Sequence, residues 1–220
     1  MDQPKSITSI TFFEFPTKKR WWAFNQMQQA LDLLNNLEGT ALVKLLGSGS
    51  GTGFSLKPDF STYALLTVWE NRDHAKNYEA SEAFLHFSEK SSSYKTFWLA
   101  CVQSHGTWGG QNPFNGTAQY LGGPIMVLTR ARIRMIKLLR FWKHVPQASQ
   151  SIAEAKGLIY TKGIGQWPAI EQATFSHWES EEAMKTYAYS SVHKAIIQKV
   201  KKEKWYKEEL FARFIPIQSP

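Results

Sequence analysis

The chain contains a single cysteine, Cys101, among its 220 residues. One cysteine excludes an internal disulfide framework and a cysteine-rich zinc site, and it fits a reducing compartment. Long hydrophobic runs are also missing, because no stretch approaches the roughly 20 apolar residues that a membrane-spanning helix needs. The first five residues, Met-Asp-Gln-Pro-Lys, lack the charged and then apolar stretches of a signal peptide. Together these absences predict a cytoplasmic protein.

Several motifs of well-known enzymes are absent as well. The sequence contains neither the His-Glu-x-x-His of zinc proteases nor the Gly-x-Ser-x-Gly of serine hydrolases. Its glycine-rich segment 47–53 has neither the spacing of a dinucleotide-binding motif nor the Gly-Lys-Ser/Thr ending of a P-loop. We therefore interpret this segment as a turning loop, and we expect no zinc site among the six histidines.

Aromatic residues are abundant, with nine Trp, eight Tyr and fourteen Phe. Hydrophobic residues make up 43% of the chain, which excludes a disordered protein because such a chain lacks the apolar groups that offset conformational entropy. A length of 220 residues is too short for two large domains but sufficient for one well-buried core. We expect one compact domain.

The formal net charge of +8 comes entirely from the second part of the chain. Residues 1–123 carry ten basic and ten acidic residues, whereas residues 124–220 carry sixteen and eight. A basic surface can contact nucleic acid, an anionic membrane or an acidic protein, or it can simply be a solvated helix face. No nucleic-acid-binding motif is present, and the aromatics follow core-like patterns, so we expect no nucleic acid partner. The excess lies in two clusters: Arg130, Arg132, Arg134, Lys137, Arg140 and Lys143, then Lys199, Lys201, Lys202 and Lys204.

The two parts of the chain resemble each other in sequence. Trp69-Glu70-Asn71 matches Trp178-Glu179-Ser180, and at the same spacing Lys76, Tyr78 and Ser81 match Lys185, Tyr187 and Ser190. A segment rich in turn formers, from Gln103 to Gly123, separates the two parts. We infer an internal duplication with one unit at 1–123, which includes the linker, and the other at 124–220.

Each unit has the same predicted order of elements. Apolar runs predict strands at 10–15, 41–46, 63–68 and 97–102, and at 125–128, 158–162, 173–178 and 210–215. Helical spacing predicts a helix over 21–37 whose buried face is formed by Phe24, Met27, Leu31, Leu34 and Leu37. Asn71, Ser81, Ser180 and Ser190 are expected to cap the helices that follow them.

The order β-α-β-β-α-β is that of a ferredoxin-like unit. Two such units in one chain can place their sheets face to face and close a barrel with the helices outside. We therefore predict an α+β fold, and we expect the barrel interior to be the place for an apolar ligand.

The basic segment 130–143 also has a helical pattern of apolar residues. Ile133, Ile136, Leu139 and Trp142 would pack inward. Arg134, Lys137 and Lys143 would then face water or lipid headgroups, as in helices that lie on membrane surfaces.

His193 has a distinctive position in the duplication. It aligns with Phe84, so one unit carries an apolar residue where the other carries a potential iron ligand. A single histidine suffices as the proximal ligand of haem. The alternative is an ordinary histidine near the start of a helix.

Nearly the whole chain carries the sequence pattern of one family. The resemblance in the first unit begins at Lys44-Leu45-Leu46-Gly47-Ser48-Gly49 and continues through Phe54, Pro58, Tyr63 and Trp69. In the second unit it includes Val127-Leu128-Thr129-Arg130-Ala131, Ile133-Arg134, Arg140-Phe141-Trp142, Lys162-Gly163-Ile164-Gly165, Thr174-Phe175-Ser176, His193 and Trp205-Tyr206-Lys207-Glu208-Glu209-Leu210-Phe211. This pattern resembles that of the spheroidene monooxygenases, the acyclic carotenoid 2-ketolases, from which His177 and Tyr189 depart.

The resemblance implies a dimeric-type α+β barrel within one chain and a haem-dependent oxygenase that places a keto group at C-2 of an acyclic carotenoid. The alternatives are a cofactor-free monooxygenase on the same barrel and a non-catalytic protein that binds haem or lipid. Two hydroxylations of one carbon give a geminal diol, which loses water to become a ketone. By analogy, haem iron would be bound by His193 in the second unit. Arg130, Arg134 and Lys162 would pair with its propionates or, for the two arginines, act on bound oxygen. The implied partners are a hydrophobic polyene, an acidic electron donor such as a ferredoxin, and the inner face of an anionic membrane.

Overall fold

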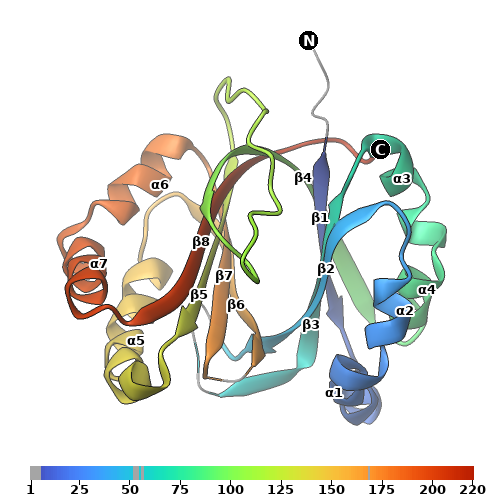
Figure 1. Cartoon of the computed structure of the whole chain (residues 1–220), viewed down its shortest axis with the longest axis horizontal. Helices are drawn as coiled ribbons and strands as arrows, with labels where there is room; N and C mark the ends of the chain where they lie inside the picture. The colour runs from blue at the N-terminus through green and yellow to red at the C-terminus, as the bar shows by residue number, and fades with distance from the viewer. Residues whose placement is uncertain (1–5, 52–54, 56, 168) are drawn as a thin grey trace.

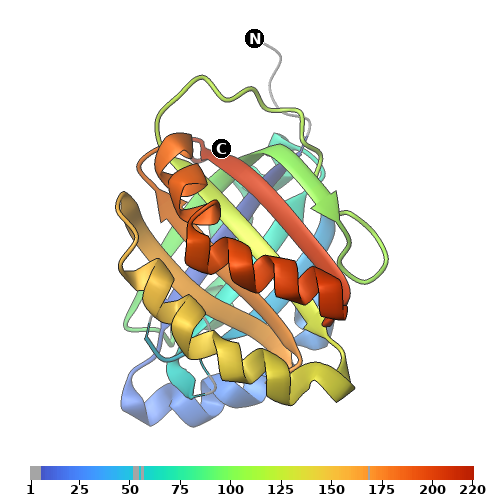
Figure 2. The ribbon, with the colours of Figure 1, turned by 90° about the vertical axis from the view of Figure 1, so that its left-hand side faces the viewer.

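The computed structural model describes residues 6–51, 55, 57–167 and 169–220, without the side chains of residues 191–193. In this part of the chain, eight antiparallel strands close into a barrel and the helices pack against its outside (Figures 1 and 2). The strand order around the barrel is β1-β3-β2-β6-β7-β5-β8-β4. Each unit therefore contributes four adjacent strands, and the predicted α+β barrel is confirmed.

The two units repeat the same order of elements. The first comprises β1 (Ile7–Glu14), η1 (Thr17–Lys19), α1 (Arg20–Gln29), α2 (Leu31–Asn35), β2 (Thr40–Gly49), β3 (Pro58–Trp69), α3 (Arg72–Lys76), η2 (Tyr78–Ala80), α4 (Glu82–Ser88) and β4 (Ser93–Gly106). The second comprises β5 (Ile125–Ile133), η3 (Met135–Lys137), α5 (Leu138–Ala153), β6 (Leu158–Trp167), β7 (Glu171–Trp178), α6 (Glu181–Ala188), α7 (Ser191–Glu203) and β8 (Tyr206–Pro216). Of the expected turning loop 47–53, residues 47–49 end β2 and residues 52–53 lie outside the described part.

Three of the predicted caps begin their helices. The side chains of Asn71, Ser81 and Ser180 accept hydrogen bonds from backbone N–H groups three residues later, at 3.0, 3.2 and 3.1 Å. These bonds satisfy donors that the first helical turn leaves without a partner. The predicted division near Ser190 is also found, because α6 ends at Ala188 and α7 begins at Ser191.

The strand registers support the duplication. Ile7 pairs with Trp69 in the first unit, and Ile125 pairs with Trp178 in the second. Each tryptophan donates its indole N–H to a serine hydroxyl at 2.9 Å, Trp69 to Ser9 and Trp178 to Ser176. The two registers give a residue-by-residue correspondence between the units.

The barrel interior is filled by side chains. Phe12 lies 6.1 Å from Phe97 and 5.8 Å from Phe175, measured between ring centroids, within one buried cluster. Trp108 and Phe114 join this cluster from the segment 107–124, which crosses the barrel in Figure 1. The expectation that the interior holds an apolar ligand is therefore wrong, because the aromatic residues fill it themselves.

The helix predicted over 21–37 is interrupted, and its buried face is displaced. Its residues form α1 and α2, with Ala30 between them. Ala23, Gln26, Ala30 and Leu34 are buried, whereas Phe24 is exposed. Leu31, the other misplaced residue of the predicted face, is exposed as well.

The predicted inward face of the basic segment is only half confirmed: Ile133 is buried and Trp142 packs against the same core cluster, but the two residues between them are wrong. Ile136 and Leu139 are 85% and 90% exposed. The physical reason is that the η3 turn separates the end of β5 from α5, and the phase of α5 is set by the burial of Phe141, Val145 and Ile152. Among the described residues, no helix has the length and apolar character needed to cross a membrane.

Candidate functional site

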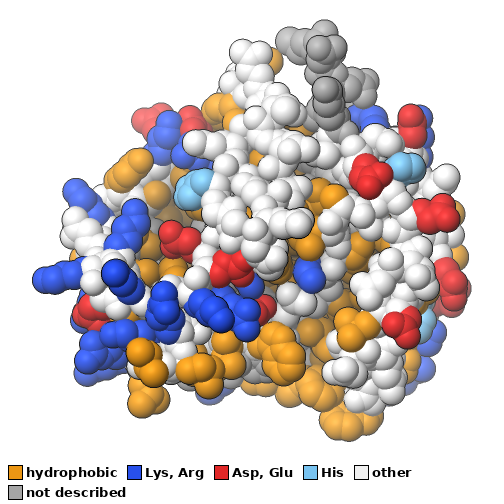
Figure 3. All heavy atoms as spheres, viewed as in Figure 1, with side chains coloured by type: hydrophobic (Ala, Val, Ile, Leu, Met, Phe, Trp, Pro, Cys, Tyr) orange, Lys and Arg blue, Asp and Glu red, His pale blue; other side chains and the backbone are white. Residues whose placement is uncertain are grey.

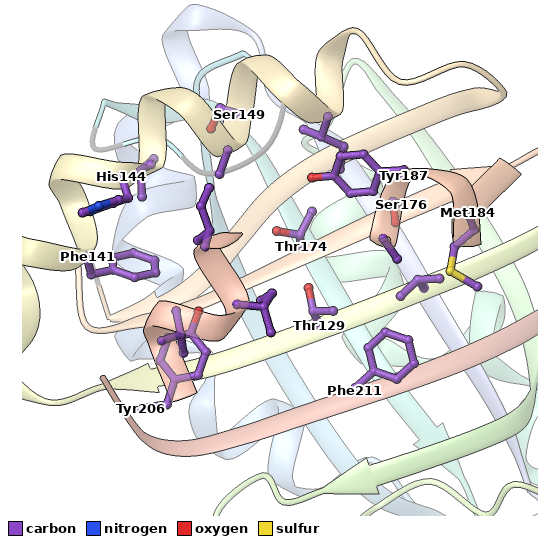
Figure 4. A pocket seen from close by; sticks show the side chains of 18 of the residues that line it. Thr129, Phe141, His144, Ser149, Thr174, Ser176, Met184, Tyr187, Tyr206 and Phe211 are labelled. Atoms are coloured by element: carbon purple, nitrogen blue, oxygen red, sulfur yellow. The ribbon is translucent and has the colours of Figure 1, made fainter. Parts of the chain in front are cut away.

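A pocket lies between the outer face of β5, β7 and β8 and the helices α5, α6 and α7 (Figure 4). It encloses a cavity of about 130 Å³, which widens into space that is open to solvent. Its walls are mainly apolar, and they include Val127, Phe141, Val145, Ile152, Trp178, Met184, Ile196, Ile197, Val200, Trp205 and Phe211. This mainly apolar lining is typical of a site for an organic ligand.

The sheet side of the pocket carries hydroxyl groups. Thr129, Thr174 and Ser176 line it from β5 and β7 (Figure 4). The Ser176 hydroxyl accepts the indole N–H of Trp178. The Thr174 hydroxyl is buried and has no hydrogen-bond partner among the described residues. A buried hydroxyl without a partner costs free energy unless a ligand supplies one.

The corresponding space in the first unit is filled. Leu65, which pairs with Thr11, corresponds to Thr174, which pairs with Thr129. Likewise Phe13, which packs 5.7 Å from Phe84 and 5.6 Å from Phe87, corresponds to Ala131 by its register. The second unit thus has smaller or more polar residues at positions where the first has apolar bulk. The pocket is a specific feature of the second unit.

His144 lies at the edge of the pocket with both ring nitrogens engaged. Its Nδ1 is 2.9 Å from the Arg140 carbonyl oxygen, and its Nε2 is 3.0 Å from Nζ of Lys199. Because a lysine ammonium only donates, Nε2 accepts and Nδ1 carries the proton. His144 therefore links α5 to α7, and it holds the ammonium group of Lys199 at the edge of the pocket.

Two tyrosines of the pocket stay protonated at neutral pH. Burial raises the pKa of Tyr187 to about 12, although a hydrogen bond with Ser151 acts in the opposite direction. Burial also raises the pKa of Tyr206, and the charge of Glu209 adds to this effect. Both hydroxyls can donate hydrogen bonds, but neither can act as a base at neutral pH.

Arg130, a predicted haem-contacting and catalytic residue, lies elsewhere. Its guanidinium is buried and pairs with Glu208 and, at 3.2 Å, with Glu171. The Trp108 ring lies 5.3 Å from the guanidinium carbon. Arg130 thus closes one end of the packed interior and does not line the pocket.

The other predicted cations are also separate from the pocket. Lys162 forms an ion pair of 2.8 Å with Asp59, which joins the two units near the β2–β6 seam. Burial alone would raise the pKa of Asp59, but Lys162 and Ser61 lower it to about 2. Arg134 is exposed and donates to the Tyr206 carbonyl oxygen. The structure therefore does not bring Arg130, Arg134 and Lys162 together at one ligand.

His193 belongs to α7, but its side chain lies outside the described part of the structure. Along α7, position 193 is one helical turn before Ile196 and Ile197, which line the pocket. Among the described residues, no group of three or more His, Cys, Asp or Glu could hold a metal ion. A cofactor with its own ring ligands would need only one axial side chain.

Two known proteins are similar in sequence to this chain over nearly its whole length. The chain is 32% identical over 216 residues to the spheroidene monooxygenase of Cereibacter sphaeroides, covering 96% of this chain and 66%, just under two thirds, of that protein. It is 31% identical over 214 residues to the spheroidene monooxygenase of Rhodobacter capsulatus, covering 94% of this chain and 89% of that protein. No family model matches the chain.

Solved structures share the fold at low sequence identity. A crystal structure of an aldoxime dehydratase in complex with butyraldoxime superposes with a TM-score of 0.62 at 8% identity. The superposition covers 97% of this chain and 80% of the other. This similarity is one of fold alone.

Proposed function

The chain belongs to the spheroidene monooxygenase family, and we propose that it is a haem-dependent monooxygenase that introduces a keto group at C-2 of an acyclic carotenoid. Each of two successive hydroxylations consumes one O₂, two electrons and two protons; one oxygen atom enters the C–H bond and the other leaves as water. The resulting geminal diol loses water to give the ketone. The observation that carries the proposal is the pocket between the sheet and helices α5, α6 and α7, whose counterpart in the described part of the first unit is filled by buried side chains.

The residues that line the pocket are of the kinds that surround a haem group. Apolar walls would cover the flat macrocycle, and the hydroxyl of Thr174 has no hydrogen-bond partner among the residues that the structure describes. We propose His193 of α7 as the axial ligand, because position 193 is one turn before the pocket-lining Ile196 and Ile197. Bound haem would supply the activation of dioxygen, which protein side chains cannot perform alone.

The protein's own residues would create the environment of the reaction. The apolar side chains of α5 and α7 exclude water, which protects a reactive centre from side reactions. Thr129 and Thr174 place hydroxyl groups on the opposite, sheet side of the pocket, where they can donate to an oxygen atom. The ammonium group of Lys199, held by His144 at the edge of the pocket, can pair with a carboxylate.

The electron donor would be an acidic protein such as a ferredoxin. Lys199, Lys201, Lys202 and Lys204 are exposed at the C-terminal part of α7, the helix proposed to ligate the haem. Such a surface attracts an acidic partner and speeds its association. Arg130 and Lys162 are already engaged in ion pairs. The lysines of α7 are therefore better suited than those two residues to bind an acidic partner.

The axial ligand can be tested by absorption spectroscopy. We expect His193→Ala to lose the haem Soret band and the formation of ketocarotenoid in a carotenoid-producing host. His105→Ala is the matched control, because His105 stacks on Phe211 from outside the pocket lining and should retain both signals. A wild-type protein that purifies without haem and is still active would contradict the haem proposal. Loss of the band in His144→Ala instead of His193→Ala would contradict the ligand.

The hydroxyl of Thr174 gives a second test. Thr174→Val removes the buried hydroxyl at almost constant volume, so the haem-free protein should lose no stability, while haem affinity should fall about tenfold if the hydroxyl donates to the bound group. Thr161→Val is the matched control, since the Thr161 hydroxyl donates to the Phe175 carbonyl oxygen. That variant should lose about 1 kcal/mol of stability and keep its haem affinity. Haem titration and denaturant unfolding measure both quantities.

A further inference from the structure

One end of the barrel presents large hydrophobic side chains to solvent. We call this surface the apolar rim. It lies at the lower end of the molecule in the view of Figure 3, where hydrophobic side chains gather along the edge. Monomeric soluble proteins rarely expose such side chains together, so a shared surface of this kind indicates an interaction site. The apolar rim consists of Trp21, Phe24, Phe60, Met135, Ile136, Leu139 and Trp167.

The duplication explains why these residues share one end. The helical segments after β1 and β5 begin at corresponding positions, η1 at Thr17 and η3 at Met135. By this correspondence Trp21, which is 73% exposed, matches Leu139. Figure 1 places the starts of α1 and α5 at the same lower end of the barrel.

Contacts on each side of the rim keep it together. In the first unit, Phe24 lies 5.6 Å from both Trp21 and Phe60, measured between ring centroids. In the second, the Trp142 indole donates to the Ala169 carbonyl oxygen at 3.1 Å. This bond fixes the turn after Trp167 against α5.

The charges on the two segments that carry most of the rim have one sign, although Arg140 is paired at 3.0 Å with Glu203, which lies outside these segments. Segments 17–24 and 134–143 contain no Asp or Glu. They carry seven cations: Lys18, Lys19, Arg20, Arg134, Lys137, Arg140 and Lys143. Asp59, next to Phe60, is neutralised by its ion pair with Lys162. Exposed apolar side chains among cations are complementary to an anionic lipid surface.

We propose that the apolar rim docks on the surface of an anionic lipid bilayer, with Trp21, Ile136 and Leu139 entering the headgroup region and the surrounding cations contacting lipid phosphates. A second copy of the chain fits this surface less well, because a symmetric contact would bring the same cations face to face. Phe141, two residues after Leu139, lines the pocket. Docking therefore places the pocket next to the bilayer, where a long polyene dissolves; this last step alone rests on the proposed function.

Flotation with lipid vesicles tests the docking. The full chain should bind vesicles of phosphatidylcholine mixed with phosphatidylglycerol, and binding should weaken as salt increases. We expect Ile136→Gln combined with Leu139→Gln to bind at least about tenfold more weakly, because two exposed apolar side chains no longer enter the bilayer. Lys137→Gln combined with Lys143→Gln should weaken binding to the anionic vesicles only.

A matched control distinguishes the rim from hydrophobicity in general. Leu121 is 69% exposed, and its neighbour Tyr120 bonds the start of α6. Figure 1 places α6 at the upper end of the molecule, away from the rim. Leu121→Gln should bind vesicles like the wild type. Equal vesicle binding by the rim variant and the wild type would overturn the proposal. A wild type that ignores vesicles but dissociates from dimer to monomer on Ile136→Gln and Leu139→Gln would assign the rim to self-association instead. Neither result depends on haem or on catalysis.

Discussion

Replacement of Ala148 by Phe is expected to lower haem occupancy and carotenoid oxidation by about 100-fold or more, because the new ring would fill space that a bound ligand needs. Ala148 lines the pocket from α5, in the same turn as Val145 and Ser149. The substitution places the ring in empty space, so the overpacking that usually destabilises a core is avoided. The variant would imitate the first unit, where Phe13, Phe84 and Phe87 fill the corresponding space.

The same substitution at Ala153 provides the control. Ala153 ends the same helix and is exposed, so Ala153→Phe should keep the wild-type Soret band and activity. Thermal unfolding of both haem-free variants should show a midpoint close to that of the wild type. If Ala148→Phe keeps full haem binding and turnover, the site of the reaction lies outside this pocket. A large fall in its midpoint would instead show that the pocket is too narrow for the ring.

The fold could be predicted from the sequence because the duplication constrains it twice. A match such as Trp69 with Trp178 fixed the relative position of the two units, and each unit independently showed the ferredoxin-like order of elements. The caps Asn71, Ser81 and Ser180 are local, since each bonds a backbone group three residues away. Local and repeated signals of this kind need no knowledge of the tertiary contacts.

The apolar rim could not be predicted, because helical periodicity assumes that each apolar residue is buried. Ile136 and Leu139 have the spacing of an inward face, yet they are exposed. The residues that pack inward, Phe141 and Val145, follow a different phase that depends on where α5 meets the sheet. Trp21, which corresponds to Leu139, is exposed as well. Both units therefore expose an apolar residue at the same position after their first strand.

The pocket was missed, although the sequence contains a signal for it. Once the units are aligned by register, Leu65 is replaced by Thr174 and Phe13 by Ala131. Loss of apolar bulk at corresponding buried positions indicates a space that the protein does not fill itself. The correspondence of Phe84 with His193 is the same kind of difference, an apolar residue in the first unit and a polar one in the second. The role of Arg130 at a ligand was inferred from the resemblance alone. Its ion pair with Glu208 on β8 joins residues that are 78 positions apart, and a local sequence pattern does not reveal such a contact.

Arg130→Leu is expected to lower the free energy of unfolding of the haem-free protein by about 3 kcal/mol, because it leaves the partly buried carboxylates of Glu171 and Glu208 without their buried cation. The charge of Glu171 stays partly neutralised in this variant, since Glu171 keeps a contact of 3.3 Å with Arg132. Adding Glu208→Gln to Arg130→Leu removes one of the two unpaired charges and should restore part of the loss. If Arg130 served mainly to pair with a haem propionate, haem affinity would fall and the stability of the haem-free protein would not.

The dependence of this stability on pH identifies the ion pair directly. Burial alone would raise the pKa of Glu208, but hydrogen bonds from the Gly110 N–H, Arg130 and Thr107 lower it to about 2, from 4.5. A carboxylate with a lowered pKa stabilises the folded state above about pH 4.5, and this contribution is lost as the pH falls towards 2. Without Arg130 the pKa of Glu208 should rise, so the acid-induced loss of stability in this range should become smaller. Asp59, held by Lys162, titrates in the same range and should leave part of the slope in the variant. Denaturant unfolding of the wild type and Arg130→Leu at pH 7 and across the acid range measures both effects, and an unchanged slope would show that Arg130 does not control the ionisation of Glu208.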